Sequence, residues 1–120
     1  MPITEVVLFV DDDGSAPLLE WFDGLPDKVT DKFIVRIGRL EECGHELRRP
    51  EADYLRDGVY ELRVRHKRVN YRLLYFFHEG RAVLAHGIVK EGKVPDREID
   101  RALGRRTRFE LDPETHTYRE

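Results

Sequence analysis

Cationic side chains gather in the second half of the sequence, where they could bind phosphate groups. Residues 54–109 carry 14 lysines and arginines against 7 acidic residues, a net charge of +7, whereas residues 1–53 have a net charge of −7 and residues 110–120 one of −3. A chain with a formal charge of −3 can therefore present one basic face to a polyanion. The other interpretation is a solvated surface with uneven charge, and both stay open at this point.

Arg72 is the cation whose surroundings are most informative. It lies in the apolar segment Tyr71–His78, where an unpaired cation would cost much free energy. We therefore expect Arg72 to bind either a phosphate or a carboxylate. The structural alternative is an ion pair with Glu61 across a hairpin. Arg63 alternates with apolar neighbours, so it lies on the polar side of its strand, and its alternative interpretation is a solvated charge.

Further basic residues flank the connection between these two segments. Arg65, Lys67 and Arg68 lie at or near the tip of the predicted hairpin and are better placed to position a phosphate than to catalyse. His66 has an unperturbed pKa of ~6.5 and could act as an acid or a base, although an exposed loop histidine usually has no such role. The five histidines and the single cysteine show no metal-ligand spacing, so we predict neither a metal nor another cofactor.

Two helices are predicted ahead of these segments, after a first strand over Ile3–Val10 that ends in an Asp-Asp-Asp-Gly turn. Apolar residues recur at i, i+3, i+4 and i+7 over Leu18–Leu25, with Ser15 as the expected cap. A second stripe runs over Val29–Cys43 and is closed by Gly44. These two helices predict a helical hairpin.

The remainder of the chain predicts an antiparallel meander and a closing helix. Period-two patterns mark strands at Val59–Arg65, Tyr71–His78 and Arg81–Lys90, after an irregular stretch over Glu46–Asp53. Pro95 begins the last helix. We therefore predict an α+β fold with one domain over residues 1–110 and a poorly ordered acidic tail over 111–120. The helices are expected on one sheet face, and charge on the other.

The segment Leu55–Arg106 resembles the phage-derived HigB-like branch of the RelE/ParE toxin superfamily. The matching pieces are DGVYELRV (57–64), YRLLYFF (71–77), HGIVKEGKVPDREIDRAL (86–103) and the pair Arg105–Arg106, with WFDGLPDKV (21–29) upstream. The resemblance implies a RelE-like fold related to microbial RNases. It also implies the toxin of a type II toxin–antitoxin pair, which cleaves mRNA on the ribosome and is silenced by an antitoxin that usually carries a helix-turn-helix domain.

The resemblance also implies roles for individual residues. Toxins of this kind do much of the cleavage with arginine and lysine, because a positive site stabilises the charge that develops on the phosphate. The matching positions are Arg63, Arg72 and Lys90, which we expect to converge on one concave patch; for Lys90 a strand-end charge is the alternative. Arg105 and Arg106 are implied to contact RNA. Phe109 stands where many relatives have tyrosine, and it can stack on a base but cannot transfer a proton.

Two other classes of function stay open. ParE-like proteins share the expected fold but inhibit DNA gyrase without cutting RNA. A degenerate toxin would retain only antitoxin binding, and the loss of a hydroxyl at Phe109 keeps this reading open. No apolar run approaches the ~18 residues of a membrane span. One cysteine allows no internal disulfide, so a reducing cytoplasm is the expected location.

Overall fold

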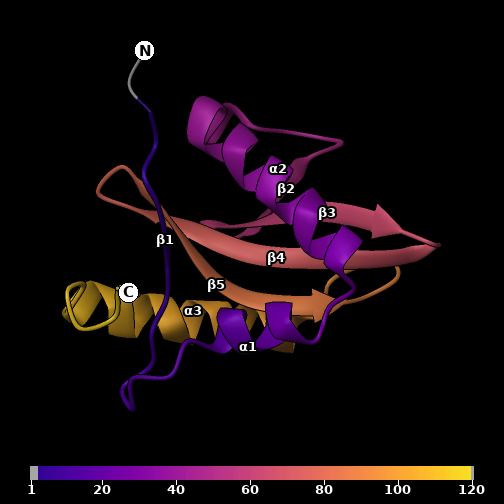
Figure 1. Ribbon diagram of the computed structural model, residues 1–120. Coiled ribbons are helices and arrows are strands. Elements are labelled where there is room, and N and C mark those ends of the chain that lie inside the picture. The colour runs from indigo at the N-terminus through magenta and orange to yellow at the C-terminus, as the bar shows by residue number, and fades with distance from the viewer. Residues whose placement is uncertain (1–2, 120) are drawn as a thin grey trace.

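A computed structural model describes residues 3–119 as a five-stranded sheet with helices on both faces (Figure 1). The predicted α+β class is confirmed. The strands are β1 (Val6–Leu8), β2 (Ala52–Arg56), β3 (Val59–His66), β4 (Val69–His78) and β5 (Arg81–Val89). The helices are α1 (Pro17–Asp23), α2 (Asp27–Cys43) and α3 (Asp96–Leu111), with a 3-10 turn at Gly44–Glu46.

The strands lie in the order β1-β5-β4-β3-β2. β1 runs parallel to β5, and all other neighbours are antiparallel, so the predicted meander is confirmed. Each hairpin closes through two residues with positive φ, namely Asp57–Gly58, Lys67–Arg68 and Glu79–Gly80. This geometry matches the right-handed twist of the strands that it joins.

The first sheet face is covered by α1 and α2. The predicted apolar stripes of both helices pack there, with Leu18, Val29, Phe33 and Leu40 buried against Leu62, Leu73, Tyr75 and Leu84. Trp21 lies directly against Gly87 of β5, where any side chain would collide with the indole ring. Gly44 closes α2 as predicted, with a φ of 55° and a bond from its N–H to the Leu40 carbonyl. The helical hairpin therefore forms as its periodicity indicates.

The second face is not simply charged, because α3 covers part of it. Ile99, Ala102 and Phe109 of α3 are buried against Leu74, Phe76, Val83 and Ala85. The expectation of helices on one face only is therefore wrong. The physical reason is visible in β4, whose central residues are buried on both sides of the sheet. A strand covered on both faces carries a continuous apolar run instead of a strict alternation.

Three local predictions also differ from the structure. The stretch Glu46–Asp53 is not wholly irregular, because β2 begins at Ala52 and pairs with β3. β1 is limited to Val6–Leu8. Ser15 does not cap α1, whose N-cap is Ala16 without a side-chain hydrogen bond. The Ser15 N–H instead bonds the Asp13 carboxylate at 2.9 Å, within the preceding turn.

The acidic C-terminal segment packs back onto β1, where the sequence predicts a poorly ordered tail. Phe9 forms an isolated bridge with Thr117, and the ring of His116 stacks on Phe9 with an interplanar angle of 3°. His116 is only 4% exposed, and its Nδ1 lies 2.7 Å from the carbonyl oxygen of Val10. Because that oxygen only accepts, Nδ1 must donate. Among residues 3–119, no helix is long and apolar enough to cross a membrane.

Candidate functional site

The second sheet face carries charged residues beyond the part that α3 covers. On β3, Glu61, Arg63 and Arg65 follow Val59 at two-residue intervals, so all four point to this face. Val59 packs with the α3 core, whereas the three charged residues lie outside the buried apolar cluster. Strand alternation therefore places both the α3 core and a line of charge on one face, separated along β3.

Arg63 and Arg72 are register partners on β3 and β4. Arg72 is 7% exposed, and its Nη1 donates to Oε1 of Glu61 at 2.9 Å, with Glu61 itself 2% exposed. The carboxylate alternative predicted for Arg72 is thus confirmed. Arg63 differs, because its side chain is 31% exposed and its Nη1 lies 4.0 Å from Asp53. Only Arg63 of the two presents a loosely paired guanidinium to solvent.

A hollow of about 350 Å³ opens beside this pair. Arg49, Asp53, Leu55, Glu61, Arg63, Arg72, Gly92, Lys93 and Val94 line it. Four cations thus face two carboxylates. Arg49 pairs with Asp53 at 2.8 Å, and Arg72 pairs with Glu61, which leaves Lys93 and Arg63 to give the hollow a positive balance. Such a balance favours an anionic ligand.

A second hollow of about 280 Å³ lies on the other side of the pair and is lined by Arg36, Pro50, Arg63, Val64, Arg65, Asn70, Tyr71 and Arg72. Val64 and Tyr71 are register partners between the pairs Arg63–Arg72 and Arg65–Asn70. Their side chains belong to the core on the opposite face. Because alternate side chains point to opposite faces, only their backbone can line this hollow. No carboxylate lines it, so its electrostatic balance is strongly positive.

The hairpin tip next to the second hollow holds Lys67 and Arg68 at φ values of 49° and 67°. Both side chains are exposed. Two-residue turns of this type favour Asn-Gly or Asp-Gly, and the other two hairpins of the sheet do carry glycine at their second position. Arg68 therefore differs from its counterparts Gly58 and Gly80, because it holds a positive φ that costs a residue with a side chain free energy. The pKa of neighbouring His66 is lowered by desolvation and then by Lys32, Lys67 and Lys28.

Lys90 is not brought together with Arg63 and Arg72. It is exposed and lines neither hollow. Its backbone N–H bonds the Asn70 carbonyl at 3.1 Å, just after β5 has ended at Val89. The lysine that does line the first hollow is Lys93 in the following loop. The expected convergence of three cations therefore holds for two of them.

The C-terminal candidates have structural contacts. The expectation that Phe109 stacks on RNA is wrong, because its ring is fully buried against Phe76 and His78. Arg105 is also not free, since its Nη1 donates to the Ala85 carbonyl at 2.6 Å. The apolar stripe of α3 that faces the sheet runs from Ile99 and Ala102 on to Phe109, so Phe109 lies in the core.

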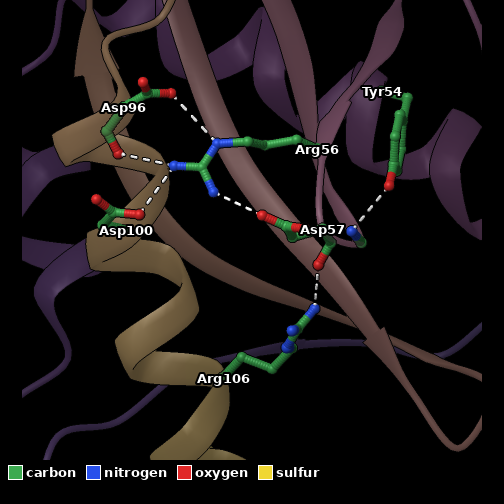
Figure 2. Close-up of polar contacts among 7 residues, drawn as sticks. Tyr54, Arg56, Asp57, Asp96, Asp100 and Arg106 are labelled. Atoms are coloured by element: carbon green, nitrogen blue, oxygen red, sulfur yellow. Dashed lines mark hydrogen bonds and ion pairs between the residues drawn. The ribbon is translucent and has the colours of Figure 1, made fainter.

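Arg106 fastens α3 to the β2–β3 turn instead of projecting toward RNA. Figure 2 shows its Nη1 donating to the Asp57 carbonyl, at 2.5 Å. In the same view Arg56 reaches from β2 to Asp96 and Asp100 of α3, at 3.2 and 2.8 Å. These contacts hold α3 beside the β2–β3 turn. The part of the sheet face farther along β3, where Arg63 and Arg65 lie, is therefore not covered by α3.

His86 on β5 faces α3 and contacts two of its residues. Its Nε2 lies 2.8 Å from Oε1 of Glu98, and its Nδ1 lies 3.4 Å from Nη1 of Arg105. Because a guanidinium only donates, Nδ1 accepts and Nε2–H donates to the carboxylate. Burial lowers the pKa of His86, and the hydrogen bond to Glu98 opposes that shift. Within the described chain, no group of three His, Cys, Asp or Glu residues is arranged to hold a metal ion.

Arg49, Lys93 and Arg36 line the hollows, although the sequence analysis assigns none of them to the site. Arg49 and Lys93 lie in irregular segments, where periodicity gives no orientation. Arg36 lies on the polar side of α2, and its Nε donates to the Arg63 carbonyl at 3.0 Å. The helix pattern could have shown that Arg36 avoids the core, but not which strand it meets.

Comparison with known protein families identifies one family whose model matches most of the chain. Residues 20–107 match the family described as phage derived protein Gp49-like (DUF891). No curated protein matches the chain at a significant level. The matched range spans α2, all strands from β2 to β5 and most of α3, and it includes Arg63, Arg72 and both hollows. The chain therefore belongs to the Gp49-like family, a RelE/toxin-like family of toxin–antitoxin systems.

Proposed function

We propose that this chain is the toxin of a type II toxin–antitoxin pair and cleaves mRNA on the ribosome without a metal. The family supports a toxin with an antitoxin partner. The observation that supports cleavage of RNA is the Arg63–Arg72 register pair, which stands between two hollows of positive balance. A RelE-like fold, a HigB-like branch, a helix-turn-helix antitoxin and a cytoplasmic location belong to the same proposal.

The two arginines have different parts in the proposed reaction. Arg63 is the more exposed guanidinium and would donate to the non-bridging oxygens of the scissile phosphate. Arg72 is neutralised by Glu61 and is a positioning residue, because this buried ion pair fixes the strand next to Arg63. Lys93 takes the place at the first hollow that the sequence suggests for Lys90.

The expected chemistry is transfer of the phosphate to the neighbouring ribose. The 2′-oxygen bonds to phosphorus, the bond from phosphorus to the 5′-oxygen breaks, and the proton of the 2′-hydroxyl is lost while the 5′-oxygen gains one. The products are a 2′,3′-cyclic phosphate and a 5′-hydroxyl. A guanidinium at the phosphate lowers the barrier because negative charge accumulates on these oxygens in the transition state.

Expression in a bacterium with an inducible promoter tests the proposal. Wild type should stop growth and leave mRNA with new 5′-hydroxyl ends, and Arg63→Ala should do neither. Arg97→Ala removes an equal charge from an exposed position on α3 and should behave as wild type. Intact mRNA with wild type would contradict cleavage, and accompanying DNA damage would instead indicate a gyrase inhibitor.

A second candidate is a module that binds its antitoxin without cutting RNA. The buried Glu61–Arg72 ion pair favours it, because that pair neutralises one of the expected catalytic cations. Wild-type protein that binds its antitoxin but leaves mRNA on translating ribosomes intact would select this candidate.

A further inference from the structure

The outer edge of β3 loses its strand partner halfway along. β2 pairs with β3 as far as Ala52–Leu62, and the Arg63 N–H then bonds the Glu51 carbonyl. Beyond this point two side chains from α2 take the place of a strand. Arg36 Nε donates to the Arg63 carbonyl at 3.0 Å, and Lys32 Nζ donates to the Arg65 carbonyl at 2.9 Å. The missing strand therefore draws two cations of α2 to the sheet edge.

A third hollow of about 350 Å³ lies at this edge, lined by Lys32, Val35, Arg36 and Arg65. It shares Arg36 and Arg65 with the second hollow, which in turn shares Arg63 and Arg72 with the first. Because each hollow shares lining residues with the next, the three follow one another along the surface, and we call this series the groove. This groove leads from the open sheet face around the edge of β3 to α2.

The charge along the groove is one-sided. Carboxylates line only the first hollow, whereas the second and third are lined by cations and uncharged residues. Glu51 approaches Arg36, with Oε2 3.8 Å from Nη1, but Lys32 and Arg65 form no ion pair among the described residues. Like charges this close repel one another, so the groove favours a ligand that brings several negative charges.

The spacing of the cations suits a single strand. Arg63 and Arg65 are two residues apart on one strand face, which places them about 7 Å apart along β3. This separation is comparable to that of successive phosphates in an extended polynucleotide. A duplex is stiff, with a persistence length of about 50 nm for DNA, and cannot turn from the sheet face to its edge over so short a path.

We infer that Lys32, Arg36 and Arg65 form a second phosphate site, so that the groove holds single-stranded RNA on both sides of the phosphate at Arg63. This inference rests on the proposed function for the identity of the polyanion. It adds a surface of α2 to the RNA-binding residues, and it requires a substrate longer than the dinucleotide that contains the scissile bond.

Binding of non-cleavable, 2′-O-methylated single strands of two and eight nucleotides tests the inference. Lys32→Ala should weaken binding of the eight-nucleotide strand about fivefold, and it should reduce the slope of log affinity against log salt by about 0.7, the value for one lost phosphate contact in single strands. Binding of the dinucleotide should not change. Lys32→Arg should restore both values, and Arg97→Ala should leave them as in wild type.

The outcomes separate this inference from the proposed function. If wild type cleaves mRNA and binds the long strand, but Lys32→Ala leaves its affinity and salt slope unchanged, only the second phosphate site is wrong. If wild type cleaves mRNA on ribosomes but binds neither free strand, the second phosphate site is wrong and the proposed function stands. If wild type neither cleaves mRNA nor binds either strand, the proposed function fails and the inference fails with it. An equal loss of dinucleotide binding in Lys32→Ala would show that the substitution disturbs the Arg63 site, and this would also overturn a separate α2 site.

Discussion

Arg63 and Arg72 oppose each other in register on β3 and β4, yet only Arg72 is bonded to a buried carboxylate. Glu61 lies diagonally across the strand pair from Arg72, since its direct partner is Leu74. One arginine is thereby fixed and neutralised, while the other remains half-exposed at the mouth of two hollows. This difference divides a pair of identical side chains into a fixed support and a group that is free to bind a phosphate.

The first prediction concerns the buried ion pair. Glu61→Gln leaves the Arg72 guanidinium buried without a counter-charge, and we expect the free energy of unfolding to fall by about 3–5 kcal/mol. Urea denaturation measures this loss. The matched control is Asp53→Asn, whose carboxylate is more exposed and should cost at most ~1 kcal/mol. A similar cost for both variants would show that the Glu61–Arg72 pair is not effectively desolvated.

The second prediction concerns the strained hairpin tip. The double substitution Lys67→Asn and Arg68→Gly matches the turn to its positive φ values, and it should raise the free energy of unfolding by about 1 kcal/mol or more. The same change removes two exposed cations, so affinity for single-stranded RNA should fall. Glu79→Asn relieves a similar φ of 49° at the β4–β5 turn and is the control. It should stabilise the protein without weakening RNA binding. If the double variant were less stable than wild type, the claim of backbone strain at Lys67 and Arg68 would be contradicted.

The third prediction concerns pH. Burial lowers the pKa of His86 from its ordinary value of 6.5, so the unfolded chain takes up a proton at a higher pH than the folded chain does. The stability that the protein has with His86 neutral is fully present above pH 6.5, and it is lost as the pH falls from there through the pKa of His86 in the folded chain. Wild type should therefore lose stability as the pH falls below 6.5. His86→Gln should show a smaller slope in this window. Equal slopes would contradict a histidine that is kept neutral.

The fourth prediction separates a core role of Phe109 from RNA stacking. Phe109→Leu keeps an apolar side chain in the core, where the ring is fully buried, and should cost about 1.5 kcal/mol of stability or less. RNA affinity, measured under conditions in which the variant stays folded, should equal that of wild type. A loss of RNA affinity without a loss of stability would indicate direct stacking.

The sequence predicts most elements because their apolar spacing is regular, but it predicts their packing less well. The stripes of α1 and α2 and the alternation of β3 specify which side faces the core. The second core beneath α3 is encoded only in the unbroken apolar run of β4, which permits burial on either face. The docking of His116 against Phe9 depends on contacts between distant ends of the chain, and no local pattern records it.

The candidate site shows the same limit. The possible Glu61–Arg72 pair is visible in the sequence because both residues lie on neighbouring strands of one hairpin. Lys93 and Arg49 come from irregular segments, where no period fixes a direction. Lys32 and Arg36 lie on the polar face of a helix. They meet β3 because β2 begins only at Ala52, opposite Leu62, and leaves the later residues of β3 without a strand partner on that edge. Lys90 fits the family motif, but the strand ends just before it.

The most direct test of the central claim is single-turnover cleavage of mRNA on purified ribosomes by wild type, Arg63→Ala and Arg97→Ala. If Arg63 stabilises charge on the scissile phosphate, Arg63→Ala should slow cleavage by about 100-fold or more at unchanged stability, while Arg97→Ala keeps the wild-type rate. Equal rates for wild type and Arg63→Ala would contradict the claim that this groove binds the reacting phosphate.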